Sequence, residues 1–469
     1  MPPLAGAGAT PSALDPERVP EDVRQVLAEL GQAGRRSWLV GGLVRDLVSG
    51  RARHDEREFD VASPATPAEV QRLFRRVIPT GIEHGTVTVL AGDLRVEVTT
   101  FRGEGPYVDG RRPSSVTFHT DLEADLARRD FTMNALAWDP LSGDFRDPFG
   151  GVADIRRGLI RAVGDPRQRF AEDGLRPLRA VRFAAQHGYR LHRPTLAAIR
   201  PARDVVEQVS RERLAEELSR LVVAPHAAAG LVLLEATDLL EILFPALASL
   251  PPSARRHAVA AASAPFRASR GDRDRLRRLR LAALLHLLPP KEARESVVAL
   301  RLPGRLADGV SEILAAGPCL GAAAGALPGR PEEVRRWLSR VGTERSADVL
   351  EVWGADASHQ GRSARRLTRD VRSLRRRVAA ELGRKPPLST ADLALDGRRV
   401  LAILGTSGPV VGEALRHLLE VVVEDPSRNA APALEAELRA WWAGRLARGP
   451  AGAGFDEPPR TGGGAAGPG

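Results

Sequence analysis

Apolar residues recur with two different periods along the chain. Between 20 and 32 they stand three or four positions apart, which predicts an amphipathic helix. Over 85–90 and 94–99, polar and β-branched residues alternate, and the intervening Ala-Gly-Asp predicts that two strands form a hairpin. Beyond about residue 150 the helical period continues almost to the end. The pattern therefore predicts a mixed first region followed by a helical remainder.

The stretch from Leu39 to Asp46 combines an apolar strand, a turn and a helix. Its Gly41-Gly42 turn lets backbone N–H groups approach an anion, and the N-terminus of the following helix favours phosphate. Glu58 and Asp60 follow on a predicted strand, where their i, i+2 spacing directs both to one face, able to share a divalent metal. A glycine turn or an acidic pair alone is more often purely structural, but the two together outline a nucleotidyl-transfer site.

Further candidate groups stand later in the first region. Glu97 lies on a predicted strand, where a lone glutamate usually faces solvent but here would add a third carboxylate. The segment 125–135 predicts an amphipathic helix. Asp130 and Asn134, four residues apart, would share one helical face suited to binding the hydroxyls of a sugar.

A charged helix is predicted over 170–183. Its Asp173, Arg176 and Arg179 would share one face at i, i+3 spacing. Pro177 should bend this helix or mark its first turn.

Three other segments have weaker signals. The segment 101–120 has no clear period and predicts a mobile loop. The arginine-rich segment 362–377 predicts either an RNA-binding face or a solvated helix face. His286 lies in an apolar run, but Leu287 stands where a metal-dependent phosphohydrolase motif requires aspartate, so we exclude that motif.

Charge and cysteine content narrow the class of protein. The 469 residues carry a formal net charge of +10, which suits a nucleic-acid partner, although a GC-rich genome would also favour arginine codons. The single cysteine, Cys319, excludes an internal disulfide and a Cys-cluster metal site, and we expect no disulfide-linked partner. The start of the chain lacks secretory-signal features and no run of about eighteen apolar residues occurs, so we expect a cytoplasmic protein without a membrane span.

Taken in order, these motifs resemble those of the class II CCA-adding tRNA nucleotidyltransferase/poly(A) polymerase family, in the polymerase-β superfamily. Five stretches match: Gly41–Asp46 with Glu58-x-Asp60, Asp125–Ala135, Asp147–Gly151, Glu172–Phe183 and Arg211–Leu218. The resemblance implies template-independent addition of CCA to the 3′ end of tRNA from CTP and ATP, with Mg²⁺ as cofactor. It also implies an α+β fold, in which a small mixed-sheet head precedes a helical neck, body and tail.

On this reading the chain divides into six parts. They are a disordered leader (1–18), the catalytic head (19–150), a base-recognition neck (151–222), a helical body (223–330), an RNA-binding helical tail (331–448) and a disordered C-terminus (449–469).

The resemblance also implies roles for the motif residues. Those expected to hold the triphosphate are Gly41, Gly42, Arg45 and Asp46. Those expected to bind metal are Glu58 and Asp60, with Glu97 as the third catalytic carboxylate. Those expected to contact the ribose and phosphates are Arg128, Arg129, Asp130 and Asn134. Those expected to read the base are Asp173 and Arg176, supported by Arg179 and Arg182.

One residue departs from the family pattern, and several activities remain open. The family usually has aspartate at the first metal position, where this chain has Glu58; Asp55 is a conceivable substitute. The rivals are an A-adding or CC-adding specialist, a poly(A) polymerase, and a non-catalytic RNA-binding homologue. The presence of the 101–120 segment favours full CCA addition, because CC-adding specialists lack the flexible loop.

Overall fold

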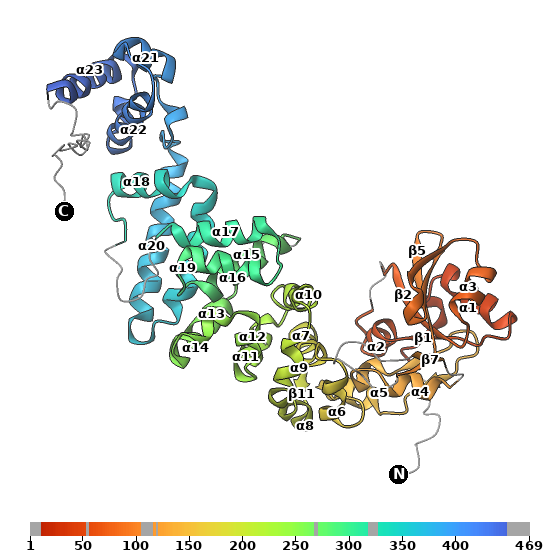
Figure 1. Ribbon diagram of the computed structural model, residues 1–469. Helices are drawn as coiled ribbons and strands as arrows, with labels where there is room; N and C mark the ends of the chain where they lie inside the picture. Colours follow the sequence, from red (N-terminus) through yellow and green to blue (C-terminus); the bar gives the residue numbers. More distant parts are fainter. Residues whose placement is uncertain are drawn as a thin grey trace, which may run out of the picture. The chain divides into compact units, whose positions relative to one another are not determined.

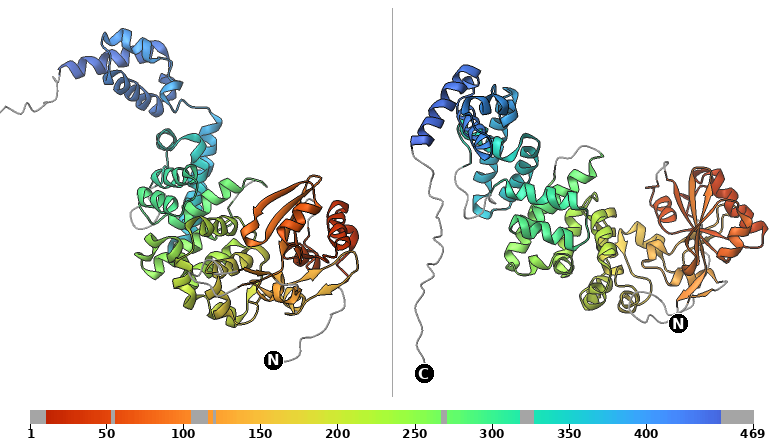
Figure 2. Two further views of the ribbon diagram at one scale, coloured as in Figure 1. Left: turned by 45° about the vertical axis from the view of Figure 1, so that its right-hand side comes forward. Right: turned by 45° about the horizontal axis from the view of Figure 1, so that its top comes forward.

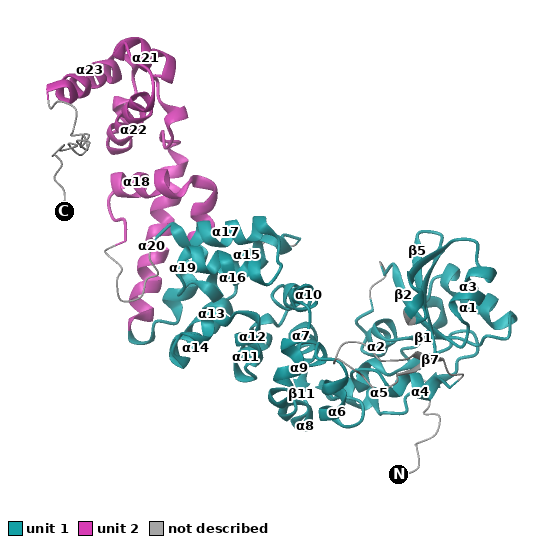
Figure 3. Ribbon diagram, in the orientation of Figure 1, with its two compact units in different colours: residues 1–319, 351–362 teal, residues 320–350, 363–469 magenta. Residues whose placement is uncertain are grey.

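The structure is a computed structural model that describes residues 11–52, 56–104, 116–118, 121–266, 271–317 and 327–447 (Figure 1). The chain forms two compact units. The first comprises residues 1–319 and 351–362, and the second comprises residues 320–350 and 363–469 (Figure 3). The six-part division and its boundaries stay a prediction. Asp55, the 105–115 part of the predicted loop and the segment from 449 onward lie outside the described residues.

A seven-stranded mixed sheet organises the head. Its order is β3-β4-β5-β2-β1-β8-β9, and every neighbouring pair is antiparallel except β2 and β5. The strands are β1 (Trp38–Val40), β2 (Glu58–Ser63), β3 (Val77–Gly81), β4 (Thr86–Ala91), β5 (Leu94–Thr100), β8 (Ala137–Trp138) and β9 (Phe145–Arg146). The pairing of β4 with β5 confirms the predicted hairpin.

Helices cover one side of this sheet, and the other side is covered in part and stays open around Asp60 and Glu97. The helices α1 (Glu21–Gln32) and α3 (Pro67–Leu73) pack against β4 and β5 (Figures 1 and 2). The side chains of Val23, Val26, Leu27 and Leu30 in α1 are all buried, which confirms the predicted amphipathic helix. Along β2, Phe59 and Val61 are buried while Asp60 is exposed, because successive side chains point to opposite faces. The sheet therefore presents its acidic side chains on the open face.

Two segments of the head differ from the prediction. The prediction of a helix over 125–135 is wrong. The helix α4 (Leu122–Ala127) ends early, and a single 3₁₀ turn (Thr132–Asn134) follows after a turn and a bend. Part of the 101–120 segment has regular structure, because β6 (Arg102–Glu104) pairs with β7 (Val116–Phe118). Local hydrogen bonding between these two short strands overrides the weak sequence signal.

The helical remainder of the first unit begins with α5 (Gly151–Arg156), α6 (Pro166–Glu172) and α7 (Arg176–His187), together with a two-stranded pair of β10 (Leu159–Ile160) and β11 (Arg190–Leu191). Pro177 lies in the first turn of α7, as predicted. The helices that follow are α8 (Arg193–Ala197), α9 (Arg203–Glu207), α10 (Arg211–Leu221), α11 (Ala227–Ala236), α12 (Leu239–Leu243), α13 (Pro245–Ala248), α14 (Pro252–Ala262), α15 (Arg273–Leu285), α16 (Pro290–Ala299) and α17 (Gly304–Ala315).

The second unit is helical throughout the part that the structure describes. Its helices are α18 (Pro331–Val341), α20 (Ala364–Gly383), α21 (Gly397–Leu404), α22 (Pro409–Glu424) and α23 (Ala431–Ala447), and α19 (Thr343–Ser358) contributes residues to both units. The buried Arg335 joins α18 to α20 and α22, because it pairs with Glu381 at 3.1 Å and donates to the Val423 carbonyl at 2.7 Å. Among the described helices, none combines the length and apolar character needed to cross a membrane.

Candidate active site

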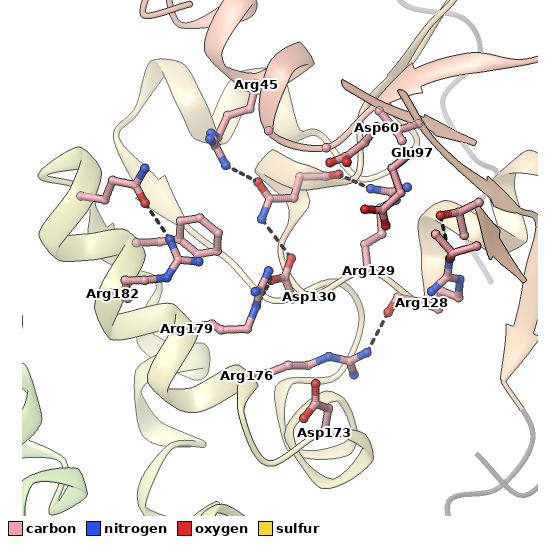
Figure 4. Close-up of a pocket in the computed structure, with 18 of the residues that line it drawn as sticks. Arg45, Asp60, Glu97, Arg128, Arg129, Asp130, Asp173, Arg176, Arg179 and Arg182 are labelled. Atoms are coloured by element: carbon pink, nitrogen blue, oxygen red, sulfur yellow. Dashed lines mark hydrogen bonds and ion pairs between the residues drawn. The ribbon is translucent and has the colours of Figure 1, made fainter. Parts of the chain in front are cut away.

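A cleft of about 690 Å³ lies on the open side of the sheet, where the head meets α7 (Figure 4). Most of the predicted site residues line it: Gly41, Gly42, Arg45, Asp60, Glu97, Arg128, Arg129, Asp130, Asn134, Asp173, Arg176, Arg179 and Arg182. Two others, Asp46 and Glu58, adjoin the cleft without lining it. Residues far apart in the sequence thus converge on one cavity.

The glycine turn at the start of α2 (Gly42–Val48) lies against the carboxylates. Gly41 has φ 71°, a backbone conformation that side chains rarely adopt. A Cβ placed there would lie 3.1 Å from Asp60 Oδ2 and 3.4 Å from Arg129 Nη1. Glycine therefore serves both the turn and the close approach of the backbone to the acidic group.

Asp60 and Glu97 face the cleft from adjacent parallel strands. The register of β2 and β5 places them directly opposite each other. Both residues remain open to solvent at the cleft surface. The crowding of protein atoms raises the pKa of Asp60, and the charge of Glu58 adds to this effect, while Arg129 and Arg45 lower it. The negative charge of Glu58 therefore opposes that of Asp60, a repulsion that positive charge nearby offsets.

A chain of hydrogen bonds links Arg45 on α2 to α7. Arg45 pairs with Asp46 at 2.8 and 3.0 Å and donates to Asn134 Oδ1 at 2.8 Å. Asn134 donates to Asp130 Oδ1 at 3.0 Å, and Arg179 pairs with Asp130 Oδ2 at 2.7 Å. Burial alone would raise the pKa of Asp130, but Arg179 and Asn134 outweigh it and the net shift is downward. The predicted Asp130–Asn134 proximity is correct, although a tight turn produces it and not a helix.

The proposed base-reading pair lies at the break between α6 and α7. Asp173 ends α6 with an extended backbone, so the prediction that it shares a helical face with Arg176 is wrong. Its carboxylate accepts a 3.0 Å hydrogen bond from the N–H of Leu175, and Arg213 Nη2 lies 3.2 Å from both of its oxygens. Arg176 pairs with Glu172 at 2.7 Å. The break places Asp173 outside both helices, where Leu175 and Arg213 hold its carboxylate.

Partners on α10 fix the remaining arginines of α7. Arg182 pairs with Glu217 at 2.5 Å and lies over the Phe183 ring, 3.8 Å from its centroid. Arg179 lies 3.7 Å from the same glutamate. Burial lowers the pKa of Arg182, which Glu217 partly offsets. The motif-based reading missed Glu217 and Arg213 as site residues, although the family motif at Arg211–Leu218 had pointed to their helix.

Asp125 organises the two arginines that follow α4. Arg128 donates to Asp125 Oδ1 at 2.9 and 2.6 Å, and Arg129 lies 3.3 Å from the other oxygen. Asp125 is buried, so its charge is strongly felt by both guanidinium groups. The Arg128 carbonyl in turn accepts a 3.0 Å hydrogen bond from Arg176. One buried carboxylate thus sets the positions of two cleft arginines, and its only sequence signal was its place in the 125–135 motif.

Comparison with known proteins agrees with this geometry. Residues 37–161 match the family model of the poly A polymerase head domain, and residues 188–250 match that of a probable RNA and SrmB-binding site of polymerase A. A CCA-adding enzyme of Geobacillus kaustophilus is 38% identical over 87% of this chain and 94% of its own length. The chain belongs to the CCA-adding enzyme family. The family resemblance predicted from the motifs is thereby confirmed.

Solved structures of CCA-adding enzymes share the fold. The Bacillus stearothermophilus CCA-adding enzyme in complex with CTP superposes with a TM-score of 0.68 at 33% identity, covering 91% of this chain and 98% of that one. A Thermotoga maritima CCA-adding enzyme complexed with tRNA has a TM-score of 0.61 at 18% identity. These matches confirm the predicted α+β head with a helical remainder. Membership in this nucleotidyltransferase family also implies dependence on a divalent metal ion.

Proposed function

We propose that this protein adds C, C and A to the 3′ end of tRNA, using CTP and ATP and releasing pyrophosphate. The observation that carries the proposal is the convergence of the family's motif residues in one cleft of a chain 38% identical to a CCA-adding enzyme. The bound CTP of the B. stearothermophilus structure supports a nucleotide as the ligand. The cytoplasmic location of this chain stays a prediction.

Glu58 and Asp60 are the proposed ligands of Mg²⁺, with Glu97, opposite Asp60, as the third carboxylate. Mg²⁺ takes oxygen ligands and is usually held by one or two carboxylates plus substrate phosphates. The two cleft carboxylates fit that donor set, since they stand opposite each other on adjacent strands. When bound, the ion would polarise the α-phosphate, activate the RNA 3′-hydroxyl and neutralise the pyrophosphate.

Two groups of residues would hold the rest of the nucleotide. Those proposed for the triphosphate are the Gly41-Gly42 turn, Arg45 and Asp46, because the turn precedes a helix N-terminus and Arg45 is fixed by two partners. Those proposed for the ribose and phosphates are Arg128, Arg129, Asp130 and Asn134. The pairing of Asp130 with Asn134 leaves this polar wall ordered before substrate binds.

Asp173 and Arg176 would select the base without a nucleic-acid template. A carboxylate accepts from an exocyclic amine, which C carries at N4 and A at N6, and an arginine donates to the neighbouring ring nitrogen. U and G present a carbonyl at that position, which would set two acceptors against each other. Arg179 and Arg182, held by partners on α10 and in the head, would support this wall of the cleft.

The exposed arginines of α20 would contact the RNA backbone. Arg362, Arg365, Arg366, Arg369, Arg372 and Arg376 are exposed on or just before this helix. Their spacing leaves a basic face of several turns, which suits a phosphate backbone. Arg375 and Arg377 instead donate to backbone carbonyls of the same unit, so they help to hold α20 in place.

Incorporation on a defined tRNA tests the proposal. The full chain is incubated with tRNA ending at its discriminator base, CTP, ATP and Mg²⁺, and the product is sized and sequenced. Three added nucleotides reading CCA support it; a long A-tail, CC alone, A alone or no product each contradict it. Asp60→Asn is the matched control, because the neutral isostere should lower kcat by roughly 10²–10³-fold while tRNA binding stays intact. Retained activity in that variant would remove Asp60 from the metal site.

A further inference from the structure

A second cluster of potential metal ligands lies in the helical part of the first unit, away from the cleft. It brings together His257 on α14, His286 directly after α15, and Asp356 on α19. One ligand atom from each lies within 4.8 Å of the others. His286 and Asp356 are buried, and His257 is half-buried. Among the described residues this is a group of three ligand side chains that the nucleotidyl-transfer chemistry does not use.

The orientation of His286 indicates what the cluster holds. Its Nδ1 lies 2.7 Å from the Ala283 carbonyl, which can only accept, so Nδ1 carries the proton of the neutral ring. Its Nε2 then carries a lone pair. This atom is buried, has no hydrogen-bond partner among the described residues and lies 3.3 Å from Asp356 Oδ1. Two acceptors at this distance are satisfied by a cation between them, either a second proton on the ring or a bound metal ion. An Nδ1–H bonded to a backbone carbonyl is also the usual arrangement of a metal-ligating histidine.

The distances fit a tetrahedral ion. With metal–ligand bonds of 2.0–2.1 Å, the edge of a tetrahedron is about 3.3 Å, which is the separation of His286 Nε2 and Asp356 Oδ1. His257 Nε2 lies 2.6 Å from the same oxygen, a hydrogen-bond distance that would lengthen when an ion replaces the proton. Gln360 Nε2 donates to that oxygen at 2.7 Å, which steadies the carboxylate from outside the triad.

A cavity adjoins the cluster and would supply the fourth ligand. It measures about 140 Å³ and is lined by His286 and Asp356 together with mainly apolar side chains, among them Leu288, Ile313 and Trp353. This volume admits water molecules, and a water completes the coordination of many three-ligand sites. Among the described residues, no arginine or lysine lines it, so this lining does not offer the groups that would bind a phosphate ester. Together with Leu287 this argues against a phosphohydrolase, as the sequence had indicated.

We propose that His257, His286 and Asp356 bind one divalent transition-metal ion, of which Zn²⁺ fits best, in a site that ties α14, α15 and α19 together. Two imidazoles and one carboxylate suit Zn²⁺, Co²⁺ or Ni²⁺, whereas Mg²⁺ prefers oxygen ligands alone. The site is therefore separate in position and in chemistry from the Mg²⁺ site proposed for the cleft. Its role is structural, because the ligands come from α14, from the end of α15 and from α19, of which α19 is remote from the other two in the sequence.

Co²⁺ titration of the untagged full chain tests this inference. In excess Mg²⁺, which occupies oxygen-only sites, one equivalent of Co²⁺ should bind and give the intense visible absorption of a tetrahedral ion. His257→Gln, at a half-buried position, should weaken this binding by about 100-fold or more, since loss of an outer-shell partner alone costs 10–100-fold. His359→Gln is the matched control, because this exposed histidine near the end of α19 lies outside the triad, and it should bind like the wild type.

Two results would overturn the inference. One is a wild-type chain that shows no tetrahedral Co²⁺ spectrum and contains no stoichiometric zinc after purification with zinc in the medium. The other is a His257→Gln chain that binds as tightly as the wild type. Asp60→Asn supplies a second measurement: the Co²⁺ spectrum should persist unchanged in it, and its loss would assign the ion to the cleft. All three readouts are independent of CCA addition.

Discussion

Arg213 holds the Asp173 carboxylate from α10, with Nη2 lying 3.2 Å from both carboxylate oxygens. The N–H of Leu175 supports one of those oxygens from the other side. The proposed base-reading group is therefore oriented by a residue that the sequence reading did not assign. Because Arg213 and Asp173 are partly exposed, with side-chain exposures of 38% and 25%, a modest energy suffices to release Asp173 toward a base.

Removal of Arg213 should relax base selection. We expect Arg213→Ala to reduce the preference for CTP over UTP, measured as the ratio of their kcat/KM values, by about tenfold. Glu212→Ala is the control on the same helix. Glu212 is exposed, and its contact with the exposed Arg301 is long, at 3.8 Å. An unchanged ratio in Arg213→Ala would show that Asp173 is oriented without this pair.

Substitution of Gly41 should damage the site more than the fold. Gly41→Ala places a methyl group 3.1 Å from Asp60 Oδ2 on a backbone with φ 71°. The strained backbone should cost about 1 kcal/mol of unfolding free energy or somewhat more. The displaced carboxylate should lower kcat by roughly 10²-fold, because small misplacements of reacting groups are costly. Thermal unfolding and single-turnover incorporation measure the two effects.

Gly50 separates these two contributions. It has φ 69°, nearly that of Gly41, yet a Cβ there would meet no atom within 4 Å. Gly50→Ala should therefore lose stability through backbone strain alone and keep nearly normal incorporation. Equal losses of kcat in both variants would mean that backbone strain, and not the contact with Asp60, explains the effect.

Local patterns predicted the elements well and the long-range partners poorly. The strand, turn and helix around Gly41 follow from apolar spacing and glycine, and the hairpin of β4 and β5 follows from alternation. The opposition of Asp60 and Glu97 depends on the parallel pairing of β2 with β5, which no local pattern encodes.

The errors have the same origin. Asp130 and Asn134 were placed on a helix because they are four residues apart, but α4 ends at Ala127 and a 3₁₀ turn brings them together. The exclusion of a phosphohydrolase motif around His286, on the ground of Leu287, still stands. The sequence could not show that His257 and Asp356 come from other helices to meet that histidine, since they are separated from it by 29 and 70 residues.

The arginines of α20 should determine part of the salt dependence of tRNA binding. Replacing Arg365, Arg366 and Arg369 by glutamine should weaken binding and reduce the slope of log K against log salt by about 2–3, since each phosphate contact contributes roughly 0.7–0.9. Filter binding at several salt concentrations measures the slope. A triple variant of the exposed Arg72, Arg75 and Arg76, in the head, makes the same charge change and should keep it. Equal slopes in both triple variants would mean that these arginines of α20 lie on a solvated helix face and do not contact the RNA.

His187, at the end of α7, should make stability fall in mild acid. It is buried between Phe183 and Tyr189, its Nε2 has no hydrogen-bond partner, and burial together with Arg45 and Arg51 lowers its pKa to about 3. The unfolded chain binds this proton below pH 6.5 while the native chain does not. Stability should therefore be lost progressively as the pH falls from 6.5 toward 3.

The substitution His187→Leu should remove this pH dependence. Relative to the wild type, its unfolding free energy should rise by about 2 kcal/mol between pH 7.5 and pH 5, at 1.36 kcal/mol for each pH unit below 6.5. Urea unfolding of both proteins at the two pH values measures the difference, in which the titration of carboxylates common to both cancels. A constant difference would mean that the native chain accommodates a charged His187, despite the positive charges of Arg45 and Arg51 beside it.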